Sequence, residues 1–272
     1  MSKQPTESDL LLPFERHNLR GDYREFLKAK RNNLLASIQC FRGLWDAYQL
    51  LDEIWMKEIG NLTALREAKQ LVPGLLFIHA HLKFRLSREL AFSFCMPEAW
   101  GVLRVGIESV AFAHKMYRNP ELVQVWSAKD EGEPERRAFK KAFEDNKKAA
   151  LYSASEFLRE LYEHWQFSSD WGSHTSVAAM ATRLRLSNTA GAEGWNLDYF
   201  EVDETRAVTS LYSLLEASYQ MECVFNDVFQ DRFTLDPSLV TTRARFLKTH
   251  RGLAKTILLK YGKANVSIAQ AL

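Results

Sequence analysis

The chain has 272 residues, of which 46% are hydrophobic and 12% aromatic, and its formal net charge at pH 7 is +2. A chain of this length and composition fills a sizeable core, which excludes disorder as its main state. A net charge so close to zero argues against a protein whose whole surface binds nucleic acid. The longest uncharged apolar stretch, 71–82, is interrupted by Pro73 and falls short of the roughly 20 residues of a membrane span.

The first nine residues are polar and do not form the basic and apolar regions of a secretory signal, so we expect a cytoplasmic protein without membrane association. The cysteines, Cys40, Cys95 and Cys223, share no spacing typical of zinc or redox sites and are predicted to be buried thiols. None of the seven histidines has a glutamate three residues before it, as helical di-iron sites require. We therefore expect no metal and no cofactor.

In chain order, the first predicted helix is 34–59, where apolar residues recur at spacings of four and three and only Asp52 breaks the pattern. A short helix is then expected to end at Pro73, because proline lacks the backbone donor and clashes with the preceding turn. Two further helices are predicted at 75–96 and 97–117. The second is apolar on nearly all sides and is therefore expected to lie at the centre of the fold.

A short helix is predicted after Asn119 and Pro120, which are typical of a helix start. Of the 20 residues in 129–148, 13 are charged, with mixed signs, which favours a solvated loop and helix arm. The chain is expected to be helical over 135–165 and to form a polar loop at 167–175.

In the segment 184–202, apolar and polar residues alternate after a glycine-rich turn, which predicts one small β-hairpin. Asp203 and Asp236 each precede a long periodic segment and are predicted to cap the last two helices. The predicted fold is an all-α, multi-helix bundle of about 7–9 helices. We expect one helical domain over 21–263, with a flexible N-terminal arm at 1–20 and a C-terminal tail at 264–272.

Charge is unevenly distributed along the chain. From Pro237 onward there are seven basic residues and no acidic one, which gives this segment +7 and the rest −5. The basic residues are Arg243, Arg245, Lys248, Arg251, Lys255, Lys260 and Lys263. A segment of this kind favours an acidic partner or RNA.

The apolar helix 97–117 carries Arg104 and Glu108, which lie four residues apart on one face. Because a buried unpaired ion is costly, these two side chains should pair with each other or with a facing group. A structural ion pair is one interpretation, and a pair that lines a ligand pocket is the other. The preceding helix carries a basic stripe of His81, Arg85 and Arg88.

The polar loop holds Ser169, Asp170 and His174 next to aromatic residues. This cluster is our candidate continuation of the ligand site at Arg104 and Glu108. The alternative is structural, with Ser173 or Thr175 capping a helix. The loop contains no Gly-x-Ser-x-Gly motif of the kind that presents a nucleophilic serine.

The Arg104-x3-Glu108 helix, the segment after Asn119 and the Ser169-x4-His174 loop together resemble an uncharacterised bacterial all-helical family of unknown function. The resemblance covers about 75–183 and implies a helical fold but no activity. Arg245 and His250 have the Arg-x4-6-His spacing of the HEPN superfamily, which includes metal-independent ribonucleases, although Phe246 stands where active members commonly carry a polar residue.

Three hypotheses of function follow. The first is a helical module that binds a small ligand or a protein partner through Arg104, Glu108, Ser169, Asp170 and His174. The second, implied by the HEPN resemblance, is a ribonuclease with Arg245 and His250 as catalytic residues. The third is a non-enzymatic interaction protein acting through the basic C-terminal helix. The sequence leaves open whether the protein is an enzyme and whether it forms a homodimer through its long apolar stripes.

Overall fold

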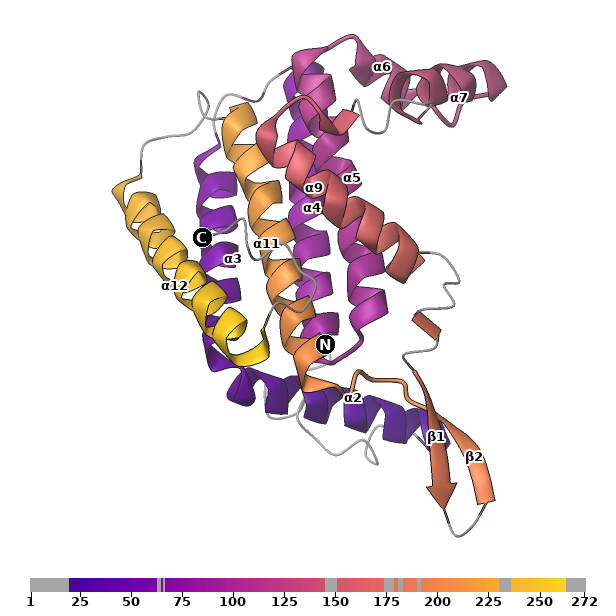
Figure 1. Ribbon diagram of the computed structural model, residues 1–272. Helices are drawn as coiled ribbons and strands as arrows, with labels where there is room; N and C mark the ends of the chain where they lie inside the picture. Colours follow the sequence, from indigo (N-terminus) through magenta and orange to yellow (C-terminus); the bar gives the residue numbers. More distant parts are fainter. Residues whose placement is uncertain are drawn as a thin grey trace, which may run out of the picture.

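The computed structural model describes residues 20–62, 65, 67–144, 151–173, 179–180, 183–189, 192–229 and 236–262. Within these ranges the chain forms nine α-helices, two short π-helical segments and one β-hairpin (Figure 1). The predicted class, an all-α multi-helix bundle, is confirmed. The long helices are α2 (Gly21–Cys40), α3 (Arg42–Asn61), α4 (Ala68–Phe92), α5 (Met96–Arg118), α9 (Glu156–Ser168), α11 (Glu204–Phe229) and α12 (Pro237–Tyr261).

The long helices form two layers. One layer contains α3, α4 and α5, and the other contains α12, α11 and α9, with α11 packed on all three helices of the first layer (Figure 1). α2 crosses one end of the bundle next to the hairpin, whereas α6 (Leu122–Ser127) and α7 (Glu133–Phe139) extend from the opposite end. The short π-helical segments η2 (Lys140–Glu144) and η3 (Ser169–Ser173) continue α7 and α9.

The hydrophobic core lies between the two layers and is rich in aromatic side chains. The Phe225 ring contacts that of Trp55 in a stacked pair at 5.4 Å and that of Phe77 in a tilted pair at 4.6 Å, which joins α3, α4 and α11. The hydroxyl of Tyr48 donates a 2.7 Å hydrogen bond to the carbonyl oxygen of Leu211, which fixes α3 against α11. Burial of such large rings dominates the stabilisation of the fold.

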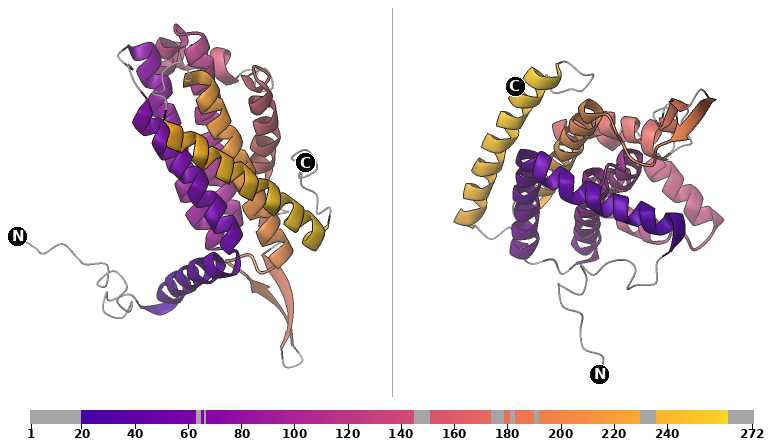
Figure 2. Two further views of the ribbon diagram at one scale, coloured as in Figure 1. Left: turned by 90° about the vertical axis from the view of Figure 1, so that its left-hand side faces the viewer. Right: turned by 90° about the horizontal axis from the view of Figure 1, so that it is seen from below.

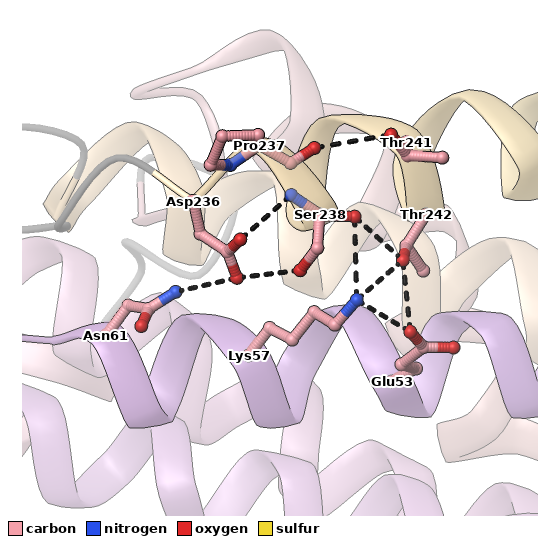
Figure 3. Close-up of polar contacts among 8 residues, drawn as sticks. All are labelled: Glu53, Lys57, Asn61, Asp236, Pro237, Ser238, Thr241 and Thr242. Carbon is pink, nitrogen blue, oxygen red and sulfur yellow. Dashed lines mark hydrogen bonds and ion pairs between the residues drawn. The ribbon is translucent and has the colours of Figure 1, made fainter.

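Both predicted aspartate caps are present. The Asp203 carboxylate accepts a 2.9 Å hydrogen bond from the backbone N–H of Arg206, and that of Asp236 accepts one of 2.8 Å from Ser238. Figure 3 shows that the start of α12 is also tied to α3. There Lys57 Nζ donates to Thr242 Oγ1 at 2.8 Å and pairs with Glu53.

Several expectations from the sequence were wrong. The segment 167–175 does not form a loop over its described part, because α9 continues to Ser168 and η3 covers Ser169–Ser173. Pro73 does not end a helix but lies inside α4, where it is buried, so tertiary packing outweighs the lost backbone hydrogen bond. The first long segment divides at Phe41 into α2 and α3. Cys40 is exposed, whereas Cys95 and Cys223 are buried as expected.

The hairpin pairs β1 (Leu184–Thr189) antiparallel with β2 (Ala192–Leu197), within the segment 184–202. Residues 1–19 and 263–272 lie outside the described ranges, and so do most of the expected N-terminal arm and the whole C-terminal tail. Among the helices that the structure describes, none is both long and apolar enough to cross a bilayer.

Candidate functional site

Arg104 and Glu108 of α5 meet Trp165 of α9 where these two helices pack. The indole Nε1–H of Trp165 donates to Glu108 Oε1 at 2.8 Å, and Arg104 Nη2 lies 3.4 Å from the same oxygen. The Arg104 guanidinium also covers the Trp165 ring, 5.1 Å from its centroid, in a cation–π contact. The two residues predicted to pair are thus brought together, and a tryptophan orients the carboxylate.

A cavity of about 250 Å³ opens beside this group. Five of its nine lining residues are aromatic, and the charged residues among them are two glutamates and a lysine. The lining residues are Glu108, Phe112, Lys129, Phe139, Phe143, Glu144, Leu151, Tyr152 and Trp165. Aromatic side chains combined with a few polar groups are typical of a small-molecule site.

Tyr152 is the unusual member of this wall. It is only 2% exposed, and its hydroxyl has no hydrogen-bond partner among the described residues. Burial, followed by the negative charge of Glu108, raises the pKa of this phenol well above its ordinary value. The group therefore stays protonated and keeps its O–H available as a donor.

The segment η3 lies directly on α5, one turn before Arg104. A Cβ atom added at Gly101 would lie 2.7 Å from the carbonyl oxygen of Gly172, so two glycines allow the two backbones to approach. Ser169 of this segment is buried and donates to the carbonyl oxygen of Trp165 at 2.8 Å, whereas Asp170 is exposed. Neither lines the cavity, and His174 lies outside the described residues.

Gly101→Ala is expected to lower the free energy of unfolding by about 1–3 kcal/mol, because the new methyl group would force η3 away from α5. Gly252→Ala in α12 is the matched control, since a Cβ there meets no atom within 4 Å and alanine favours the helix by up to about 1 kcal/mol. Urea unfolding of both variants measures the difference. A Gly101→Ala protein as stable as wild type would contradict the close approach.

The predicted basic stripe of α4 belongs to a different cluster, around Asp52 of α3. The Asp52 carboxylate accepts hydrogen bonds of 2.7 Å from both His81 Nε2 and Arg85 Nε. Burial raises the pKa of Asp52, but the hydrogen bonds from His81 and Arg85 outweigh it and hold the pKa well below the ordinary value. The break that Asp52 makes in the apolar pattern of α3 was the sequence signal of this cluster. It is a structural tie between α3 and α4.

A second cluster, missed from the sequence, consists of Glu58, Glu222 and Arg243. Both carboxyls are fully buried on α3 and α11, and the Arg243 guanidinium of α12 contacts both of them. Burial raises the pKa of each carboxyl, and the charge of Glu58 raises that of Glu222 further. These residues lie 21 to 185 positions apart, so the sequence holds no local signal of their meeting.

Arg245 and His250 do not share a site. His250 is 5% exposed, with its ring among those of Tyr212, Tyr219 and Phe246, and its Nε2 lies 2.6 Å from a carboxylate oxygen of Glu216. In contrast, Arg245 is exposed and lines an open groove of about 990 Å³ between α3 and α12. The histidine is therefore packed in the core, on a different side of α12 from the arginine.

The described part of the chain contains no group of three or more histidine, cysteine or acidic side chains placed to hold a metal ion. No family model matches the chain, and no curated protein or solved structure was found to be similar to it. The function is therefore argued from the chemistry of the cavity beside Glu108 and Tyr152.

Proposed function

We propose that the protein is a helical module that binds a small organic ligand in the cavity beside Glu108 and Tyr152. The observation that carries this proposal is the Tyr152 hydroxyl, which is buried in the cavity wall without a hydrogen-bond partner among the described residues. Leaving a buried hydroxyl unpaired costs about 1–3 kcal/mol. The hydroxyl itself is sealed from solvent, so a small shift of the side chain toward the cavity would let a ligand atom accept its hydrogen and remove this cost.

The cavity wall indicates the chemical class of the ligand. Five aromatic rings favour a flat molecule, and about 250 Å³ suits one or two rings, since an engineered cavity of roughly 150 Å³ holds benzene. Glu108 Oε1 already accepts from Trp165, whereas its Oε2 takes no hydrogen bond from any residue that the structure describes. The expected ligand is a heteroaromatic compound with an acceptor for Tyr152 and an N–H donor for Glu108.

Ligand binding is what this site supports best. Its described lining contains no serine, threonine, cysteine or histidine that could act as a nucleophile or as an imidazole base. The aromatic wall and the fixed carboxylate instead provide shape and orientation.

Benzimidazole, which has one N–H donor and one nitrogen acceptor, is a suitable probe. We expect Tyr152→Phe to weaken its binding by up to about tenfold, measured by calorimetry or ligand-observed NMR, because one hydrogen bond is lost. The same variant should be at least as stable as wild type without ligand, since the unpaired hydroxyl is gone. Tyr162→Phe is the matched control, because Tyr162 stacks on Trp165 but does not line the cavity.

Weaker binding together with undiminished stability would support the site, because a merely structural tyrosine would lose stability. Two results would contradict it. One is equal binding by wild type and Tyr152→Phe. The other is that neither benzimidazole nor indole nor 2-aminopyridine binds at millimolar concentration.

A further inference from the structure

A stripe of five aliphatic side chains is exposed along α4. We call it the α4 stripe, and it consists of Leu71, Leu75, Ile78, Leu82 and Leu86. Their exposed fractions run from 40% to 63%, although leucine and isoleucine are usually among the most buried residue types. The spacings of four, three, four and four residues place them on one face, over about 22 Å of helix.

The opposite face of α4 is also apolar. There Phe77, Ala80 and Phe84 are fully buried against the rest of the bundle. A helix that is apolar on both faces is typical of one covered on both sides. Yet α4 is the middle helix of its layer, with α11 in front of it, and the right-hand view of Figure 2 shows it at the side of the bundle away from α11 and α12.

We propose that the α4 stripe is the seam of a homodimer in which α4 packs antiparallel against α4 of a second copy. Four of the five positions are related by two-fold symmetry about the midpoint between residues 78 and 79. With the axis at that midpoint, Leu71 meets the partner's Leu86, Leu75 meets the partner's Leu82, and Ile78 lies next to the axis. A self-complementary patch of this kind is what a two-fold interface requires.

The charges near the stripe agree with this arrangement. None of its five positions is charged, and the nearest cation on that face, Arg85, is held by Asp52 through hydrogen bonds of 2.7 and 3.0 Å. The seam can therefore exclude water without burying an unpaired charge.

Exposed apolar patches of several hundred Å² usually mark interaction sites, and a stable interface covers about 800 Å² on each partner. The stripe supplies the apolar centre of the interface, and the adjacent helix α5 carries another exposed apolar residue, Val105, which is 40% exposed. This inference is independent of the ligand cavity.

Sedimentation equilibrium of the full chain tests the proposal. Wild type is expected to be a dimer at micromolar concentration, and Ile78→Lys and Leu75→Lys are expected to be monomers with unchanged circular dichroism. Leu259→Lys is the matched control, because this leucine is 86% exposed on α12, away from the stripe, and the variant should remain a dimer. A monomeric wild type, or a dimer that survives both stripe substitutions, would overturn the proposal.

Disulfide cross-linking keeps the test decisive even if a lysine variant fails to fold. In a Cys40→Ser background, which removes the exposed native thiol, Ile78→Cys should form an interchain disulfide on mild oxidation. Leu71→Cys should cross-link to Leu86→Cys when the two proteins are mixed, but not to itself. Failure of Ile78→Cys to cross-link, or equal cross-linking by Leu259→Cys, would overturn the two-fold seam.

Discussion

The variant Arg243→Met is expected to unfold with a free energy about 3–5 kcal/mol lower than that of wild type at pH 7. Arg243 is the cation that contacts the fully buried carboxyls of Glu58 and Glu222. Removing it leaves two acidic groups in the core, with the Asn226 side chain donating to Glu58 at 3.2 Å. Urea unfolding measures the loss.

The effect of pH separates this electrostatic cost from lost packing. Burial already raises the pKa of both carboxyls above their ordinary value of 4.5, and removing Arg243 raises it further. A raised pKa means that stability is complete below the ordinary value and is lost as the pH rises through the raised value. The deficit of Arg243→Met should therefore be smaller at pH 5 than at pH 7.

Arg245→Met is the matched control, because Arg245 is exposed on the same helix. Such a surface change should alter stability by no more than about 0.5 kcal/mol. Two results would contradict this role of the cluster. One is that Arg243→Met lowers the free energy of unfolding no more than this control does, and the other is that its loss of stability does not depend on pH.

Acid is expected to destabilise the protein through His164, by up to about 3 kcal/mol between pH 6.5 and pH 4. His164 is buried on α9, where its ring stacks on that of Trp100 at 6.0 Å. Burial lowers its pKa to about 4, although the charge of Glu216 opposes the shift. The unfolded chain therefore binds a proton near pH 6.5, and the native protein only near pH 4. Stability is complete above pH 6.5 and is lost as the pH falls through 4.

His164→Gln tests this, because glutamine does not titrate in the interval. The stability difference between wild type and variant, measured by urea unfolding at several pH values, should fall steadily as the pH decreases from 6.5 to 4. A difference that stays constant across this range would show that His164 is not the group responsible. Glu58 and Glu222, whose raised pKa values make stability change with pH in the opposite direction, are present in both proteins. Their contribution therefore cancels in the difference between wild type and variant.

The fold was largely predictable because its signals are local. Capping aspartates and apolar periodicity placed α11 and α12, and the segment that is apolar on nearly all sides identified α5 as a largely buried helix, although α11, not α5, contacts all three helices of the other layer. Pro73 misled the prediction because the helix-breaking effect of proline can be recognised from the local sequence. The tertiary packing that keeps Pro73 inside α4 involves residues far away in the chain and cannot. The break at Phe41 has the same origin, since α2 and α3 share a pattern but pack on different parts of the bundle.

The site was predictable only in part. Arg104 and Glu108 were identified because two charges on an apolar helix are costly, and they do pair. The residues missed were their partner Trp165, Tyr152, whose hydroxyl has no partner among the described residues, and the rings of Phe139 and Phe143. The last two lie in the highly charged segment 129–148, where composition indicated a solvated arm, yet both rings are buried. Average charge does not show which single residues face inward.

The most direct test of the ligand site is a crystal structure of the protein soaked with benzimidazole. We predict electron density for the planar ring in the cavity of about 250 Å³, with one nitrogen within hydrogen-bond distance of Tyr152 Oη and the other near Glu108 Oε2. A cavity that stays empty, or a Tyr152 hydroxyl that is bonded to another group of the protein, would contradict a ligand-binding function.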